Sequence, residues 1–174
     1  MTEFEFTLVI SGDLADESVA QALFEGGCDD ATFGIDDGIG YGEFFREAST
    51  LSEAVFAAIV QIESVPKLRV LHIEPDDIVT MADIADRLER TRESVRLLIA
   101  GRRGKGGFPA PISHAQDRGR LWRWSDVAAW VSDSSPEEME DIEFTAALNA
   151  ALDLRRRLPL LADGLVVKEI RNLV

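Results

Sequence analysis

The chain opens with a regular alternation of apolar and mostly polar residues. The apolar positions of the pattern are Phe4, Phe6, Leu8 and Ile10. A period of two is typical of a half-buried β-strand, because successive side chains point to opposite faces. After this strand the apolar residues are spaced more widely, at Val19, Leu23 and Phe24, which predicts a helix over residues 16–26.

Two short strands are predicted next, over residues 31–35 and 39–45. They are separated by Asp36-Asp37-Gly38, and Asp-Gly between two strands is a strong signal for a tight hairpin turn. The two strands of this hairpin are therefore expected to pair antiparallel.

A second helix is predicted to start after Thr50, with Glu53 at the position of a capping box, and a last strand is expected over residues 67–73. The order is then β-α-β-β-α-β. This is the order of a ferredoxin-like fold, in which both helices cover one face of an antiparallel sheet. The fold class expected for the N-terminal part, and for the chain, is α+β.

The spacing of apolar residues between 80 and 100 is that of two helices. Thr80, followed three residues later by Asp83, has capping-box spacing, so the first helix is expected over residues 81–90. Thr91 begins the second, over residues 91–100. The apolar residues that form the inner sides of the two helices are Ile84, Ala85, Leu88, Val95, Leu98 and Ile99. Two short helices around a tight turn form the pattern of a helix-turn-helix.

The opposite side of the second helix is polar. The residues expected there are Thr91, Arg92, Glu93, Ser94 and Arg96. A helix lying in the major groove can direct such side chains at base edges, and the arginine fork matches two acceptors of guanine. These five residues are the expected base-reading set.

A glycine-rich basic stretch, residues 101–107, follows this helix. Its basic residues are Arg102, Arg103 and Lys105. Glycines allow sharp turns and close approach to another surface, and basic side chains on such a loop are suited to phosphate contacts. The polar stretch between Ile112 and Leu121 is expected to be the tip of a wing, where the contacts to DNA come from His114, Arg118 and Arg120.

Three motifs follow one another in this part of the chain. They are the Met81–Leu98 helical pair, Phe108-Pro109-Ala110-Pro111, and Leu121–Val127 with Trp130. Together, over residues 78–131, they resemble the winged helix-turn-helix domains of the MerR and phage excisionase type. The resemblance implies double-stranded DNA binding, with an aromatic strand returning from the wing into a short helix. Glu89 departs from the pattern, because that family usually has glycine at this turn position.

Within this returning strand, Trp122 and Trp124 are expected on the same side, forming the core beneath the wing. Ser125 is expected to cap a short helix over residues 126–131. Trp130 would then pack back on the same core.

A long helix is predicted after Ser135, with Pro136 at its first position and Glu138 completing a capping box. It should end at about Arg157. Its apolar residues recur at helical spacing, so it must pack on its own domain or on a second copy of the chain. The last residues, 165–174, are expected to form a short helix or strand.

Charge is distributed very unevenly along the chain, whose net charge is −14. Residues 1–77 hold 17 acidic and 3 basic side chains, whereas residues 78–131 hold 6 acidic and 10 basic ones. The basic excess lies in the segment that the helical pattern assigns to DNA. The acidic flanks are expected to be held away from DNA and to weaken nonspecific binding, which is mainly electrostatic.

Three segments are expected: residues 1–77 as an acidic domain for dimerisation, protein contact or sensing, 78–132 as the DNA-binding domain, and 133–174 as a helical arm. We find no nucleophile paired with a base, no metal-ligand spacing and no phosphate loop, so neither an enzyme nor a cofactor or metal site is expected. The single cysteine, Cys28, excludes an internal disulfide. The acidic N-terminus is not a signal-peptide start, and a cytoplasmic location is expected.

Several polar features of the acidic segment have simpler explanations than a site. Gly40-Tyr41-Gly42 lacks the aromatic and basic neighbours of an RNA-binding strand. The Asp29-Asp30 and Asp36-Asp37 pairs do not have the spacing of a calcium loop. We interpret His72 as an ordinary strand residue and Cys28 as a half-buried small apolar one.

The sequence as a whole favours a double-stranded DNA-binding regulator of transcription. A two-fold dimer would place two recognition helices about 34 Å apart and bind an inverted repeat. The alternative is an antitoxin-like or accessory protein, whose acidic N-terminal domain engages a basic protein partner.

Overall fold

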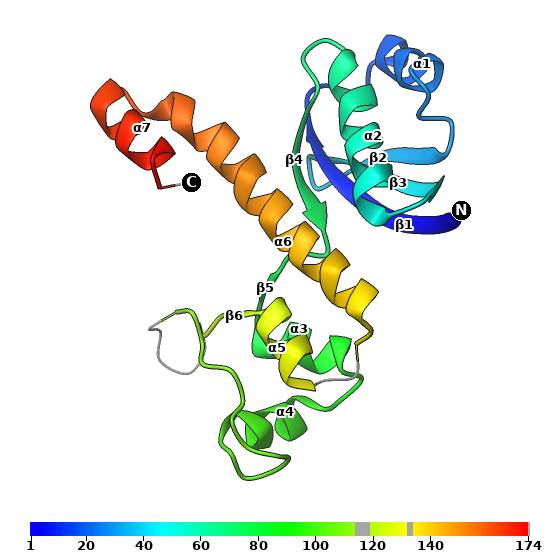
Figure 1. The fold of residues 1–174 in the computed structure, drawn as a ribbon. Helices are drawn as coiled ribbons and strands as arrows, with labels where there is room; N and C mark the ends of the chain where they lie inside the picture. Colours follow the sequence, from blue (N-terminus) through cyan, green and yellow to red (C-terminus); the bar gives the residue numbers. More distant parts are fainter. Residues whose placement is uncertain (114–118, 132–133, 174) are drawn as a thin grey trace. The chain divides into compact units, whose positions relative to one another are not determined.

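The computed structural model describes residues 1–113, 119–131 and 134–173, which form a mixed α+β fold (Figure 1). The chain has two compact units: unit 1 is Met1–Pro75 with Ala147–Val174, and unit 2 is Asp76–Ala146. This division differs from the three consecutive segments expected from the sequence, because the residues from Ala147 onward group with the acidic N-terminal part. Within the described residues, no helix combines the length and apolar character needed to cross a membrane.

Unit 1 contains a four-stranded antiparallel sheet. Its strands are β1 (Thr2–Ser11), β2 (Ala31–Asp36), β3 (Ile39–Ala48) and β4 (Arg69–Glu74), in the order β2-β3-β1-β4. The four strands predicted from the sequence are confirmed to within a few residues. In the β2–β3 turn, Asp37 and Gly38 have φ angles of 47° and 81°, the left-handed conformation that a tight two-residue hairpin requires.

Helices α1 (Glu17–Glu25) and α2 (Leu51–Ser64) pack on this sheet (Figure 1). Asp16 and Thr50 cap them, accepting from the backbone N–H groups of Ser18 and Glu53. The core of the unit is made of residues from strands and helices, among them Phe6, Leu8, Ile10, Leu23, Phe44, Val55, Ile62, Val70 and Ile73. The helices thus bury the apolar side of the alternation that the sequence shows in β1.

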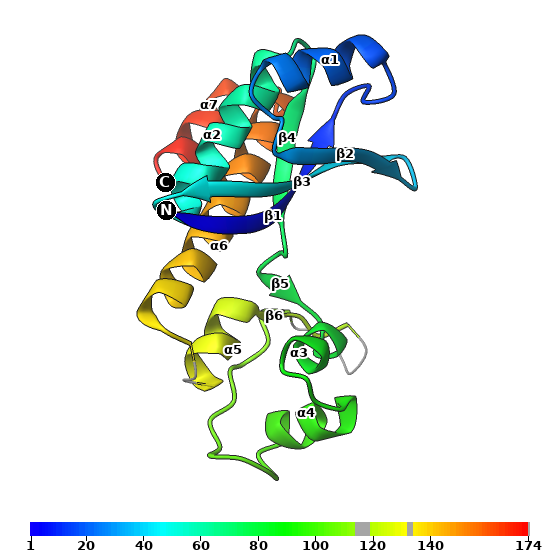
Figure 2. The ribbon, with the colours of Figure 1, turned by 90° about the vertical axis from the view of Figure 1, so that its right-hand side faces the viewer.

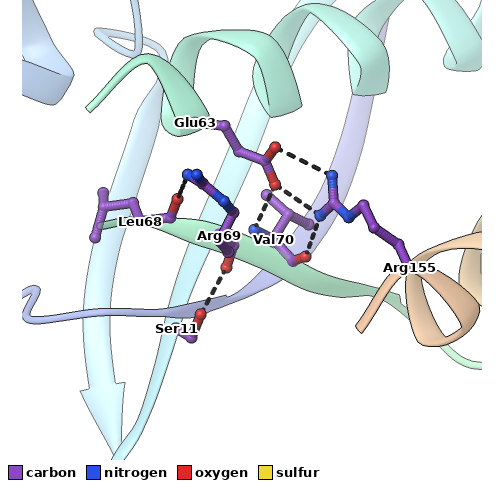
Figure 3. Close-up of polar contacts among 6 residues, drawn as sticks. All are labelled: Ser11, Glu63, Leu68, Arg69, Val70 and Arg155. Atoms are coloured by element: carbon purple, nitrogen blue, oxygen red, sulfur yellow. Dashed lines mark hydrogen bonds and ion pairs between the residues drawn. The ribbon is translucent and has the colours of Figure 1, made fainter. Parts of the chain in front are cut away.

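The outer edge of β4 is closed by side chains from two helices. In α6 (Pro136–Arg157), the Asn149 amide accepts from Ile73 N at 2.8 Å and donates to Ile73 O at 2.9 Å. Glu63 of α2 accepts from Val70 N at 3.0 Å, and Arg155 donates to Val70 O at 2.9 Å (Figure 3). Unpaired edge strands readily pair with other chains, so these contacts protect the sheet.

Helix α6 begins and ends as the sequence predicts. Ser135 N donates to Glu138 Oε2 at 2.7 Å, and Glu138 N donates to Ser135 Oγ at 3.2 Å, a complete capping box. The contacts of Asn149 and Arg155 place its second half on its own chain, in unit 1, which was one of the two expected alternatives. The tail contains the 3-10 helix η1 (Leu158–Leu160) and α7 (Gly164–Arg171).

Besides the first half of α6, unit 2 consists of short strands and helices (Figure 2). These elements are β5 (Ile78–Val79), α3 (Met81–Arg87), α4 (Arg92–Ile99), β6 (Trp122–Arg123) and α5 (Trp124–Val131). Strands β5 and β6 pair antiparallel. The buried core residues are Val79, Ile84, Ala85, Val95, Trp122 and Val127. The Thr80–Asp83 capping box at the start of α3 is confirmed.

Two boundaries in unit 2 differ from the prediction. Helix α3 ends at Arg87 and not at Arg90, because the chain turns at Glu89, which has a φ of 51°. Helix α5 begins at Trp124, so Trp124 is not on the strand beside Trp122. Ser125 is not the cap of α5: it is buried, and its backbone N–H donates to Asp77 Oδ1 at 2.8 Å.

Candidate nucleic-acid interface

Helix α4 has one side fixed in the core and the other open to solvent. Val95 and Leu98 are buried, whereas Arg92 and Arg96 are exposed. Thr91 caps the helix by accepting from Ser94 N at 3.2 Å. The expected base-reading residues therefore divide into two kinds. Arg92, Glu93 and Arg96 have exposed side chains, while Thr91 and Ser94 are joined by the cap that starts the helix.

Arg96 is held by Glu93, one turn earlier in α4. Its Nε and Nη2 atoms donate to the two carboxylate oxygens at 2.7 and 2.6 Å. This bidentate contact lowers the pKa of Glu93 and raises that of Arg96, because each charge stabilises the other. The side chains are 52% and 62% exposed, so the pair is screened by water and salt. Guanine offers two acceptors in a similar arrangement.

The turn before α4 sets the direction of that helix. Glu89 lies in the left-handed region, and Arg90 N donates to Ala85 O at 2.8 Å. Ala85 is only 1% exposed, and its small side chain allows α3 and α4 to approach closely. Glu89 has a φ of 51° and so adopts the backbone conformation for which glycine is best suited.

The basic loop, residues 101–107, is folded against Trp130 of α5. Trp130 Nε1 donates to Gly106 O at 2.9 Å, and the Lys105 ammonium lies 5.2 Å from the centre of the Trp130 ring. The four glycines of the loop have φ angles between 65° and 79°, a conformation that other residues adopt with strain. Arg102, Arg103 and Lys105 are exposed. The loop thus holds three cations at the surface directly after α4.

Hydrogen bonds close the base of the expected wing. Ile112 N donates to Leu121 O at 2.8 Å, and Ser113 Oγ donates to Gly119 O at 3.0 Å. Arg120 is half-buried beside this closure. Two expected wing contacts, His114 and Arg118, lie outside the described residues.

Three other arginines of unit 2 were not among the expected site residues. Arg87 lies 5.1 Å from the centre of the Trp124 ring and donates to Asp76 O at 2.8 Å. Arg123 pairs with Asp77 at 3.1 Å. Arg90 is exposed on the turn. The sequence signal for Arg87 and Arg90 is the alternation of arginines with acidic residues from Arg87 to Arg96. The sequence does not show that the side chains of Arg87 and Arg123 have intramolecular partners, which only the folded structure reveals.

The polar features of unit 1 have structural partners. Arg46 is buried and donates to both carboxylate oxygens of Asp30, at 2.7 and 2.8 Å. Cys28 is fully buried, not half-buried, and its burial raises the pKa of the thiol. His72 lies on β4, with Nε2 3.6 Å from Glu74. Among the described residues there is no group of three or more His, Cys, Asp or Glu side chains suited to a metal ion.

Comparison with known proteins adds no assignment. No protein-family model, curated protein or solved structure matches the chain significantly. The function proposed for the chain therefore rests on the side chains of unit 2 and on their placement.

Proposed function

We propose that the chain is a sequence-specific regulator of transcription that binds double-stranded DNA with α4 in the major groove. The observation that carries this proposal is the two-sided character of α4. Val95 and Leu98 fix the helix in a core, and Arg92 and Arg96 project from its exposed side. Direct readout of base edges needs a rigidly held helix with such side chains. In this proposal Arg92, Glu93 and Arg96 read bases.

The basic loop supplies the phosphate contacts in this proposal. Arg102, Arg103 and Lys105 are exposed immediately after α4. Arg120, His114 and Arg118 of the wing are assigned the same role on sequence grounds. Contacts to the DNA backbone position a protein on the duplex without selecting a sequence. The loop would therefore contribute affinity and α4 specificity.

The observed topology supports the two fold assignments that accompany this function. Unit 1 has the β-α-β-β-α-β order with neighbours β2-β3-β1-β4, as a ferredoxin-like fold has. In unit 2, two short helices around a left-handed turn are followed by a hydrogen-bonded loop base and a third helix. This succession supports a winged helix-turn-helix of the MerR and excisionase type.

We also propose that the protein acts as a homodimer on an inverted repeat, with two copies of α4 about 34 Å apart. The tail of unit 1 supports this, because its large apolar side chains are exposed. These residues are Leu160, Leu161, Leu165, Val166 and Leu173. Light scattering coupled to gel filtration tests the dimer, and Leu165→Glu should shift it toward a monomer.

The test of DNA binding is an anisotropy titration of labelled DNA from immediately upstream of the gene, beside unrelated DNA, at several salt concentrations. Arg96→Ala should weaken binding to the preferred site by roughly 1–3 kcal/mol and reduce discrimination. Arg102→Ala should weaken both DNAs alike and lower the salt slope by about one. Arg156→Ala is the matched control, because Arg156 is exposed in unit 1 and pairs with Asp153.

Equal affinity for both DNAs would contradict sequence-specific binding. Unchanged affinity in Arg96→Ala would contradict the base-reading role of α4. Binding to neither DNA would contradict the proposed DNA-binding function and favour the second candidate function, binding of a basic protein.

The second candidate is an accessory protein that binds a basic protein through unit 1. Strand register favours it, since Glu3 lies opposite Glu47 and Thr7 opposite both Glu43 and Glu74, and opposed residues share a face of the sheet. Retention of a basic partner by the wild-type chain, and its loss with Glu43→Gln and Glu47→Gln together, would support this function.

A further inference from the structure

A pocket of about 560 Å³ opens in unit 2 beside the turn that precedes α4. Its volume lies in the range that holds small organic ligands. The turn between α3 and α4, helix α5 and the first turns of α6 contribute its walls. The apolar part of the lining is Leu88, Trp124, Ala128, Val131 and Ile142. Such a surface fits an apolar ligand body.

Two opposite charges face the pocket from different walls. Arg90 is on the turn and Asp141 is on α6. Neither side chain has a hydrogen bond or ion pair with any other described residue. Asp141 is half-buried, and its pKa is raised by burial and by the neighbouring charge of Glu140. A carboxylate in this situation is stabilised by an approaching cation.

The other charged residues of the lining differ from these two. Arg87 is held over the Trp124 ring and by Asp76 O, and Glu138 accepts from Ser135 N. Glu89 is exposed next to Arg90. Among the described residues that line the pocket, Arg90 on the turn and Asp141 on α6 are therefore the cation and the carboxylate that a ligand can pair with, beside the apolar part of the lining.

We propose that this pocket binds a small zwitterion with an apolar body, the chemistry of a short peptide of apolar residues. Its carboxylate pairs with Arg90, its ammonium group with Asp141, and its side chains cover Trp124 and Ile142. The site does not depend on DNA binding, because ligand and protein alone form it.

Isothermal titration of the full chain with leucyl-leucine tests the proposal. Three probes each lack one feature: the N-acetyl dipeptide lacks the ammonium group, the dipeptide amide lacks the carboxylate, and glycyl-glycine lacks the apolar side chains. We expect leucyl-leucine to bind with a dissociation constant of about 1 mM or lower. Each altered probe should bind about tenfold more weakly, since each loses a charged hydrogen bond or the apolar contact.

Two variants that each remove one charge test which residue binds which end of the ligand. Arg90→Gln should weaken leucyl-leucine about tenfold but leave the amide unaffected, and Asp141→Asn should weaken leucyl-leucine but leave the N-acetyl form unaffected. Arg171→Gln and Asp126→Asn are controls, because both residues are exposed and neither lines the pocket. Circular dichroism checks that each variant is folded.

No heat of binding with leucyl-leucine at millimolar concentration would overturn the proposal. Equal binding of all four probes, or binding unchanged by both variants, would do the same. Because no DNA is present, these outcomes are separate from a failure of the proposed DNA-binding function.

Discussion

The carboxylate of Asp77 accepts a hydrogen bond from the backbone N–H of Ser125 at 2.8 Å, although 48 positions separate the two residues. The main-chain oxygen of Asp77 accepts from Trp124 N at 2.7 Å, and its other carboxylate oxygen lies 3.1 Å from Arg123 Nη1. Asp77 is 5% exposed. One buried residue therefore caps α5, and a carboxylate is favourable at a helix N-terminus.

Replacing Asp77 should destabilise unit 2. Asp77→Ala leaves Ser125 N without its acceptor in a buried place, at a cost of roughly 2–3 kcal/mol. Urea unfolding followed by tryptophan fluorescence measures this selectively, because all three tryptophans lie between residues 122 and 130. Asp86→Ala, at an exposed site on α3, should change stability by less than about 0.5 kcal/mol. Equal losses in both variants would refute the cap.

Glycine at position 89 should stabilise unit 2. Glu89 has a φ of 51°, where a residue with a Cβ carries roughly 1–2 kcal/mol of strain. Glu89→Gly removes that strain but loosens the unfolded chain, so a net gain of about 0.5–1 kcal/mol is expected. Glu89→Ala is the control, because it removes the side chain and keeps the strain. A gain of the same size in the alanine variant would assign the effect to the side chain.

Removing the charge of Glu93 should strengthen nonspecific DNA binding and weaken selectivity. Glu93→Gln releases Arg96 from its ion pair, whose shortest contact is 2.6 Å, and removes an anion from a surface proposed to face phosphates. The affinity for unrelated DNA should rise at least a few-fold and selectivity should fall, as measured by anisotropy. Binding to the preferred site should rise less than binding to unrelated DNA, because Glu93 is proposed to accept a hydrogen bond from a base there. An equal rise for both DNAs would contradict that base-reading role.

Asn149→Ala should weaken unit 1 and expose the edge of β4. The change leaves both Ile73 N and Ile73 O without partners, which costs roughly 1–3 kcal/mol. Hydrogen exchange at the Ile73 amide should become faster, and the variant should aggregate more readily. Arg156→Ala, on the exposed side of the same helix, should have neither effect. Unchanged exchange at Ile73 would count against the role of Asn149.

The capping box of α3 should lose strength in acid. Thr80 donates to the Asp83 carboxylate from its backbone and hydroxyl, and this lowers the pKa of Asp83 from its usual value of 3.8. The folded pKa is below the unfolded one, so the stabilisation is present above about pH 4 and is lost as pH falls through the folded pKa. The carboxylate is exposed, which limits the effect to less than about 1 kcal/mol. The stability difference between wild type and Asp83→Asn should therefore shrink between pH 5 and about pH 2; a constant difference would exclude this linkage.

Local signals in the sequence predicted most elements of both units. The alternation before Ile10 predicts β1, and Thr80, Thr91 and Ser135 mark the starts of α3, α4 and α6. These signals work because the residues that form a cap or alternate along a strand are neighbours in the chain. The exposed position of Arg96 could be inferred in the same way from the buried positions of Val95 and Leu98.

Features that depend on distant residues could not be predicted. Strand β5 has two residues and exists through its pairing with β6. The start of α5 is set by Asp77, so Ser125 provided a misleading local cap signal. Arg46 is buried because Asp30 lies beside it, a pairing that crosses from the β2 side of the hairpin to β3. In each case the contact that determines the structure joins residues far apart in the sequence, so the pattern of neighbouring residues does not show it.

Helix α6 closes a sheet whose strands precede unit 2 in the chain. Unit 2, Asp76–Ala146, is therefore an insertion within unit 1. During synthesis on the ribosome, every residue of unit 2 has been made before Asn149 and Arg155 are added. Domains generally fold as units. We therefore expect unit 2 to fold before unit 1, and the outer edge of β4 to stay exposed until the second half of α6 has been synthesised. The acidic N-terminal segment is thus synthesised first, but unit 1, to which it belongs, is the second unit to fold.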